Sequence, residues 1–286
     1  MKNVAIVTDS TCCLPLELMQ EYDIHLVPIY VLYQGRSYRD RIDITPSEIY
    51  KIMRARKDLP TTSVPSPEDF LNAYQQLSQK AKIILCITVT SLQSGVFNMA
   101  FSAKAMAKEI IPDVTIDVLD SRAVAGSLGF IVLEAARLAS QGAELSEVKE
   151  AARSIMNRVS FLGILDTLYY LARTGRIARA AAWAGSLLNV KPVVGHFPSV
   201  GETTPIARPR SRVTGIEHML EMMGERIRES KAHVMVQHAD EPEEAEELKT
   251  TIASRFDCSE LLLTEFSSGM GVHCGPGLLA LSFYSD

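Results

Sequence analysis

The sequence predicts an α/β protein with an N-terminal, mostly parallel, doubly wound sheet and a C-terminal α+β domain. Short apolar runs alternate with helical patterns up to Arg158, which is typical of a parallel sheet flanked by helices. After Arg158, two apolar runs flank the turn at 198–202 and predict an antiparallel hairpin. We therefore expect an N-terminal domain of residues 1–158 and a C-terminal domain of residues 159–286.

The helices of the first domain begin at recognisable caps. Thr45 and Ser66 each precede a proline and have an acidic residue three positions later. Pro28 interrupts an apolar run and favours an edge strand there. The expected strands are Val4–Val7, Ile24–Tyr33, Ser37–Arg39, Ile83–Ile87 and Val114–Leu119. The expected helices are Leu16–Tyr22, Pro46–Ala55, Pro67–Gln79, Phe97–Lys108, Gly126–Ser140 and Glu144–Asn157.

The second domain is predicted to be a sheet with helices packed on one side. Asp166 is a candidate helix cap, and Gly175 is expected to end the helix that follows. The expected strands are Ser160–Leu165, Val190–Phe197, Thr203–Arg208, His233–His238, Glu260–Phe266 and Leu278–Tyr284. The expected helices are Thr167–Arg173, Ala178–Leu188, Thr214–Glu229 and Glu243–Arg255.

Hydroxyl side chains follow the buried strand at 83–87. Ser91, Ser94 and Gly95 stand between this strand and the next helix. Ligands of open parallel sheets bind at this edge, and the helix start adds a partial positive charge. Hydroxyls and amides without a nearby fixed cation suit a carboxylate or a phosphate. The alternative is that Ser94 only caps the helix.

Two other loops carry candidate binding residues. The proline-rich stretch 59–67 holds Thr62 and Ser63 in a stiff backbone, unless it is only a helix lead-in. The glycine-rich loop 269–277 surrounds His273, which can donate a hydrogen bond to an anion or can be structural. Asp9-Ser10 and Asp120-Ser121 both end strands, where they line a pocket mouth or cap the next element.

Composition excludes several classes of protein. No apolar run reaches the length of a membrane span, the N-terminus lacks a signal peptide, and the five cysteines show no Cys-x-x-Cys spacing. We therefore expect a cytoplasmic protein without stable membrane insertion. Walker, dinucleotide-binding, nucleophile-elbow and His-x-x-x-His patterns are absent from the sequence, so we expect no cofactor and no metal.

Basic residues are concentrated in one segment. Residues 173–212 contain seven Lys or Arg and one Glu, although the whole chain carries a net charge of −5. This asymmetry indicates a basic docking face, or else only a solvated surface, rather than general affinity for nucleic acid. The candidate docking residues are Arg173, Arg176, Arg208, Arg210 and Arg212.

Taken together, these motifs resemble the DegV family of bacterial fatty-acid-binding proteins over the whole chain. The motifs are Asp9-Ser10-Thr11, the stretch 62–67, the stretch 91–95, Asp120-Ser121, Gly175-Arg176-Ile177, Lys191-Pro192 and the stretch 273–277. Four residues depart from the family pattern, namely Cys13, Thr90, Val96 and Ala125. Because Thr90 keeps a hydroxyl group, these departures bear on ligand preference more than on the head-group site.

The resemblance implies two α/β domains with a long-chain fatty acid buried between them. Thr62 and Ser91 would hold its carboxylate, with Ser94 and His273 close by and Ser63 and Gly95 in secondary positions. Such proteins are not catalytic. They present the acid to a separate fatty acid kinase, which makes an acyl phosphate for phospholipid synthesis.

Simple energetics agree with a lipid ligand. Burying about fourteen methylenes is worth roughly 11 kcal/mol before binding costs, against about 1.5–3 kcal/mol for a hydrogen bond to a carboxylate. Hydroxyls also hold a carboxylate without the strong ion pair that an arginine would form. Two alternatives remain open: a small-molecule hydrolase or phosphotransferase with a Ser/His site, and a nucleic-acid-binding regulator that uses the basic segment.

Overall fold

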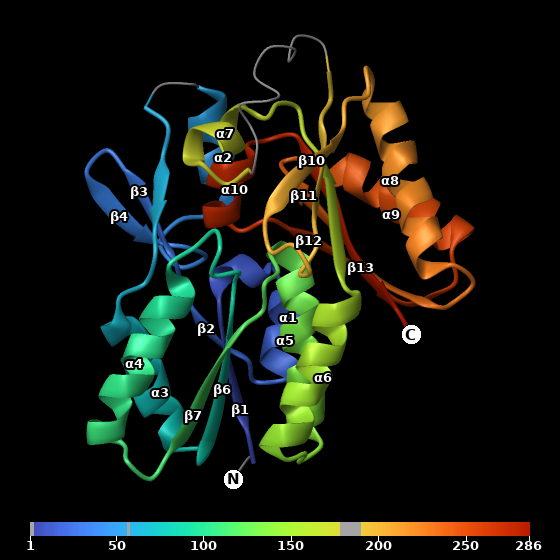
Figure 1. Cartoon of the computed structure of the whole chain (residues 1–286). Helices are drawn as coiled ribbons and strands as arrows, with labels where there is room; N and C mark the ends of the chain where they lie inside the picture. Colours follow the sequence, from blue (N-terminus) through green and yellow to red (C-terminus); the bar gives the residue numbers. More distant parts are fainter. Residues whose placement is uncertain (1–2, 56–57, 178–189) are drawn as a thin grey trace.

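Two lobes make up the molecule in the computed structural model, which describes residues 3–55, 58–177 and 190–286. The N-terminal lobe is the lower one in Figure 1 and the C-terminal lobe the upper one. The predicted helix at 178–188 and the basic residue Arg179 lie outside the described residues. None of the described helices is long and apolar enough to span a bilayer.

The N-terminal lobe contains a parallel sheet of four strands in the order β2-β1-β6-β7. Helices α3 and α4 lie on one side of this sheet and α1, α5 and α6 on the other (Figure 1), which confirms the doubly wound arrangement. The strands are β1 (Ala5–Asp9), β2 (His25–Val27), β6 (Ile83–Thr88) and β7 (Thr115–Asp120). The helices are α1 (Leu16–Glu21), α3 (Pro67–Ser78), α4 (Val96–Ile110), α5 (Ala125–Ser140) and α6 (Leu145–Arg158).

A small antiparallel sheet of order β4-β3-β5 stands beside this lobe. Its strands are β3 (Tyr30–Tyr33), β4 (Arg36–Arg39) and β5 (Thr61–Ser63). The strand predicted over 24–33 is therefore two strands that belong to two sheets. Strand β5 was not predicted, and its register pairs Thr62 with Val31. This pairing fixes the position of the Thr62 side chain.

The C-terminal lobe contains a mixed sheet of six strands in the order β10-β9-β8-β13-β11-β12. Helices α8 (Arg212–Ile227) and α9 (Pro242–Arg255) cover its outer face, as predicted for this domain's own helices. Its inner face shares one apolar core with α5 of the other lobe, to which Phe161 and Tyr284 contribute. The strands are β8 (Ser160–Ile164), β9 (Val193–His196), β10 (Thr203–Ala207), β11 (Ala232–Ala239), β12 (Cys258–Glu265) and β13 (Leu278–Ser285).

Sequence patterns predicted the starts of some short helices correctly and of others wrongly. Both predicted capping boxes are present, at Thr45 before α2 (Pro46–Arg54) and at Ser66 before α3. Asp166 was wrongly predicted as a cap, because α7 (Tyr169–Thr174) follows Leu168 and the Asp166 carboxylate pairs with Lys191 at 2.7 Å. The loop predicted at 269–277 contains helix α10 (Ser268–Cys274), which is capped by Ser267.

Candidate functional site

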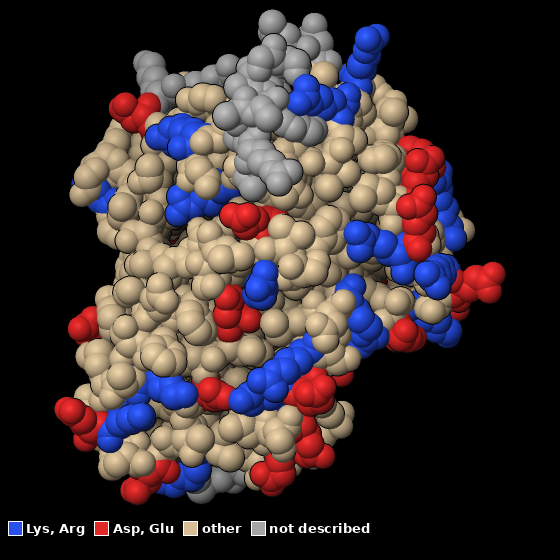
Figure 2. Space-filling view, viewed as in Figure 1, with Lys and Arg blue, Asp and Glu red and all other residues tan. Residues whose placement is uncertain are grey.

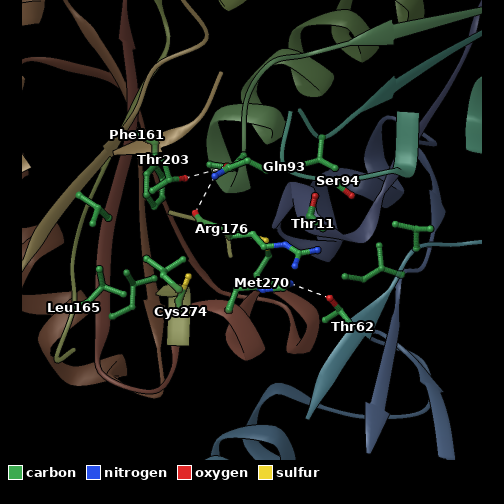
Figure 3. A pocket seen from close by; sticks show the side chains of 18 of the residues that line it. Thr11, Thr62, Gln93, Ser94, Phe161, Leu165, Arg176, Thr203, Met270 and Cys274 are labelled. Atoms are coloured by element: carbon green, nitrogen blue, oxygen red, sulfur yellow. Dashed lines mark hydrogen bonds between the residues drawn. The ribbon is translucent and has the colours of Figure 1, made fainter. Parts of the chain in front are cut away.

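A cavity lies where the two lobes meet. Side chains from both lobes line it, and most of them are apolar. In Figure 3, Thr11, Ser94 and Thr62 lie on the side of the N-terminal lobe, while Phe161 and Leu165 lie on the opposite side. The apolar lining residues are Ile29, Val64, Val89, Val124, Phe161, Leu165, Leu171, Val194, Met270, Cys274 and Leu278. The polar ones are Thr11, Thr62, Ser63, Gln93, Ser94, Arg176, Thr203 and His273.

Thr62 and His273 meet in this cavity although 211 positions separate them in the chain. The Thr62 Oγ1 atom lies 2.9 Å from the His273 Nε2 atom. Strand β5 positions the threonine, and α10 positions the histidine. Desolvation by burial, and then the charge of Arg176, lower the pKa of His273 to about 3. The imidazole is therefore neutral near pH 7.

Thr62 and neutral His273 together keep one unused hydrogen-bond donor, whichever tautomer the imidazole adopts. If Thr62 donates to Nε2, the proton of His273 is on Nδ1, a buried atom without a hydrogen-bond partner in the structure. If Nε2 donates to Thr62, the threonine proton is free instead. Because buried polar groups normally find partners, this unused donor or acceptor suits a ligand in the cavity.

Arg176 brings a positive charge into the cavity. Helix α7 ends at Gly175, whose φ of 71° lies in the left-handed region that glycine adopts at low cost. The chain then turns so that the Arg176 side chain lines the cavity (Figure 3). The prediction that the site has no nearby fixed cation was therefore wrong, because Arg176, one of the predicted docking residues, lines the cavity.

The residues of the serine loop (89–95, before α4) have different positions relative to the cavity. Ser94 lines the cavity, and its Oγ accepts a hydrogen bond from the Val96 amide at 3.4 Å. Ser91 is not among the lining residues, and its Oγ donates to Asp120 Oδ2 at 2.5 Å. Gly95 is the residue before the first turn of α4 and does not line the cavity.

Gln93 is a cavity residue that the sequence analysis missed. Its Nε2 donates to the backbone carbonyl of Arg176 at 2.8 Å, and its Oε1 accepts from Thr203 Oγ1 at 3.2 Å. It thus joins the serine loop of one lobe to α7 and β10 of the other. Its position between Ser91 and Ser94 is the only sequence signal that could have indicated this role.

The other predicted docking arginines differ in exposure and in their partners. Arg212 is tied to Glu244 at 2.6 Å and to the Gly277 carbonyl at 2.6 Å. Arg173, Arg208 and Arg210 are exposed. Of the three, Arg173 donates to the carbonyl of Pro60 at 3.3 Å, beside the strand that carries Thr62.

The geometry favours binding over covalent catalysis. Among the described residues, no hydrogen bond joins His273 to Ser91 or Ser94, and no side chain orients His273 from its Nδ1 atom. The described residues also contain no group of His, Cys, Asp and Glu that could hold a metal ion. An apolar cavity with hydroxyls, an imidazole and one guanidinium fits an amphipathic acid.

Comparisons with known proteins agree over the full length. A family model described as "Uncharacterised protein, DegV family" matches residues 3–286. A DegV domain-containing protein of Caldanaerobacter subterraneus is 31% identical over 99% of both chains. A fatty-acid-binding DegV family protein from Thermus thermophilus is 30% identical, with a TM-score of 0.91 over 100% of both chains. A stearic-acid-binding protein from Eubacterium ventriosum is 26% identical, with a TM-score of 0.91 over 100% of this chain and 98% of that one.

Proposed function

The chain belongs to the DegV family, and we propose that it binds a long-chain fatty acid in the cavity between its lobes. The observation that carries this proposal is the mostly apolar cavity whose hydroxyls, except that of Thr203, lie on the side of the N-terminal lobe (Figure 3). The two solved relatives described above bind fatty acids, which supports the same ligand class here.

In this proposal the carboxylate lies near Thr62, His273 and Ser94, and Arg176 balances its charge. The acyl chain extends among apolar side chains such as Phe161, Leu165 and Leu278. Burial of the tail supplies most of the affinity, and hydrogen bonds to the carboxylate set its orientation. Ser91 acts indirectly, because its bond to Asp120 fixes the loop that carries Ser94.

We further propose that the protein is not itself an enzyme and presents the carboxylate to a separate fatty acid kinase. The exposed Arg173, Arg208 and Arg210 would contact that partner. Charge on an exposed arginine also attracts the phosphate groups of a nucleotide-bound enzyme. The hydrolase alternative needs a serine activated by a base, and His273 faces Thr62 instead.

Extraction of the purified protein with organic solvent, followed by mass spectrometry, tests the ligand class. We expect close to one fatty acid per chain. Leu278→Trp, which fills the cavity, is the matched variant and should lose the acid while keeping a folded circular-dichroism spectrum. An extract without acyl chains, or equal amounts of acid in both proteins, would contradict the proposal.

A kinase assay tests the presenting role separately. Acyl phosphate should form only when the loaded protein, ATP and a fatty acid kinase are all present. Turnover of acyl esters or phosphate esters by the isolated chain, lost in His273→Ala, would instead favour the hydrolase or phosphotransferase.

A further inference from the structure

A second groove, separate from the interlobe cavity, lies where the end of α6 meets the turn between β9 and β10. Arginines are its main feature. Its volume is about 330 Å³, and none of its described lining residues is Asp or Glu. Figure 2 shows blue side chains gathered where α6 meets the C-terminal lobe. The lining of the groove includes Arg122, Arg158, Arg226, Asn157, Ser160 and Phe197.

Arg122 is held in the groove by backbone oxygens of the other lobe. Its Nε donates to the Pro198 carbonyl at 2.8 Å, and its Nη2 donates to the Val200 carbonyl at 3.0 Å. Carbonyl groups carry only partial negative charge. Among the described residues, no carboxylate lies within ion-pair distance of this guanidinium.

Arg158 and Arg226 lie in the last turns of α6 and α8, where the helix dipole favours a cation. The Arg226 guanidinium stacks over the Phe197 ring at 4.2 Å and lies 3.4 Å from Ser160 Oγ. The Arg158 guanidinium lies 5.4 Å from the centre of the Tyr284 ring. It donates to the Ser285 carbonyl and to the carbonyl and hydroxyl of Ser154, which leaves two of its five N–H donors for a ligand. Neither Arg158 nor Arg226 forms an ion pair among the described residues, so the groove keeps an excess of positive charge.

We propose that this groove binds a phosphoryl group, either inorganic phosphate or the head of a small phosphate monoester. Guanidinium groups recognise phosphate oxygens in pairs of hydrogen bonds, and the Asn157 amide and Ser160 hydroxyl add neutral donors. The volume is in the range of small-molecule sites. Contacts with carbonyls and rings already restrict the three guanidiniums, which lowers the entropic cost of binding. The site is independent of the fatty-acid function.

Isothermal titration calorimetry with the full chain tests the site, using sodium phosphate and glycerol 3-phosphate as probes. Arg158→Gln and Arg226→Gln should each weaken phosphate binding about tenfold or more, the loss expected for one charge-assisted contact. Arg255→Gln is the matched control, since that arginine lies at the end of α9, pairs with Glu217 of α8 and is outside the groove. Circular dichroism checks that each variant is folded.

Saturable binding that weakens in both groove variants and persists in Arg255→Gln would support the site. Tighter binding of glycerol 3-phosphate than of phosphate would identify a monoester as the ligand, and equal binding would identify inorganic phosphate. Heats that do not saturate, or that fall equally in all three variants, would overturn the proposal.

Discussion

At the scale of single residues, the cavity combines a neutral donor pair with one positive charge. Burial and Arg176 hold the pKa of His273 at about 3, so Thr62 and His273 together offer a neutral hydrogen bond near pH 7. In the proposed complex, Arg176 supplies the charge that balances the carboxylate. We therefore expect the hydroxyls to affect ligand affinity and the imidazole to affect the pH dependence of stability.

Loss of the cavity hydroxyls should weaken ligand binding. Thr62→Val and Ser94→Ala each remove one donor to the carboxylate, which is worth about 1.5 kcal/mol or roughly tenfold in Kd. Ser91→Ala should have a smaller effect, because Ser91 bonds to Asp120 and not to the cavity. Displacement of a fluorescent fatty acid from delipidated protein measures all three. An effect of Ser91→Ala larger than that of Ser94→Ala would reverse this assignment.

Acid should destabilise the delipidated protein partly through His273. Its pKa is lowered in the fold, so between about pH 6.5 and pH 3 the unfolded chain binds a proton that the folded chain does not. This contribution to stability is complete above pH 6.5 and is lost as the pH falls. From pH 7 to pH 5 the loss amounts to as much as about 2 kcal/mol. Urea unfolding should show a smaller loss in His273→Gln, and an identical loss would refute the linkage.

At the scale of elements, α10 positions His273 because small residues let this helix approach its neighbours. A Cβ atom at Gly271 would lie 2.7 Å from the Tyr50 ring. The glycines that make this segment resemble a loop in sequence are therefore needed for close helix packing. Sequence patterns favour a loop here, since glycine has low helix propensity and a seven-residue helix offers too few apolar positions to show a period.

Gly271→Ala should destabilise the fold by about 1–3 kcal/mol through overpacking against Tyr50. Gly224→Ala in α8 is the matched control, because its Cβ would meet Phe256 at an ordinary 3.4 Å. That change should be neutral or stabilising by up to about 1 kcal/mol. Urea unfolding midpoints of the two variants compare them directly. Equal midpoints would show that close packing at Gly271 does not limit stability.

Local sequence patterns made some parts of the site predictable and not others. Ser94 stood after a strand of the parallel sheet, at the edge where ligands bind. Thr62 and His273 stood out only because proline-rich and glycine-rich stretches surround them. The bond between Ser91 and Asp120 could not be predicted, because it depends on how two loops pack. The inward direction of Arg176 depends on one left-handed glycine, whereas the sequence shows only a basic segment. Strand β5 is three residues long, too short to show a pattern.

At the scale of the whole molecule, one apolar core joins the two lobes. Phe161, Met235 and Tyr284 on the inner face of the C-terminal sheet belong to the same core as α5 and β1. The first core crosses the boundary predicted near Arg158, whereas a second core under α8 and α9 belongs to the C-terminal lobe alone. The composition of each half indicates its sheet type, but a shared core appears only when both halves are folded.

Calorimetry should therefore show one cooperative unfolding transition for the delipidated chain. A fatty acid that binds only the folded state should raise Tm, and free ligand at one hundred times Kd adds about 2.7 kcal/mol of stability. Thr62→Val should reduce this rise in Tm because it weakens ligand binding, and it should not split the unfolding transition. Two resolved transitions would show that the lobes fold independently.

The shared core also restricts how the proposed fatty acid can enter and leave the cavity. A rotation that swung the lobes apart on a hinge would expose Phe161, Met235 and the α5 side chains to water, at a cost comparable to unfolding. We therefore expect the ligand to pass through brief, local displacement of peripheral segments such as α7 and the serine loop, which Gln93 connects. The residence time of the cargo then follows the lifetime of a few hydrogen bonds and not the strength of the contact between lobes.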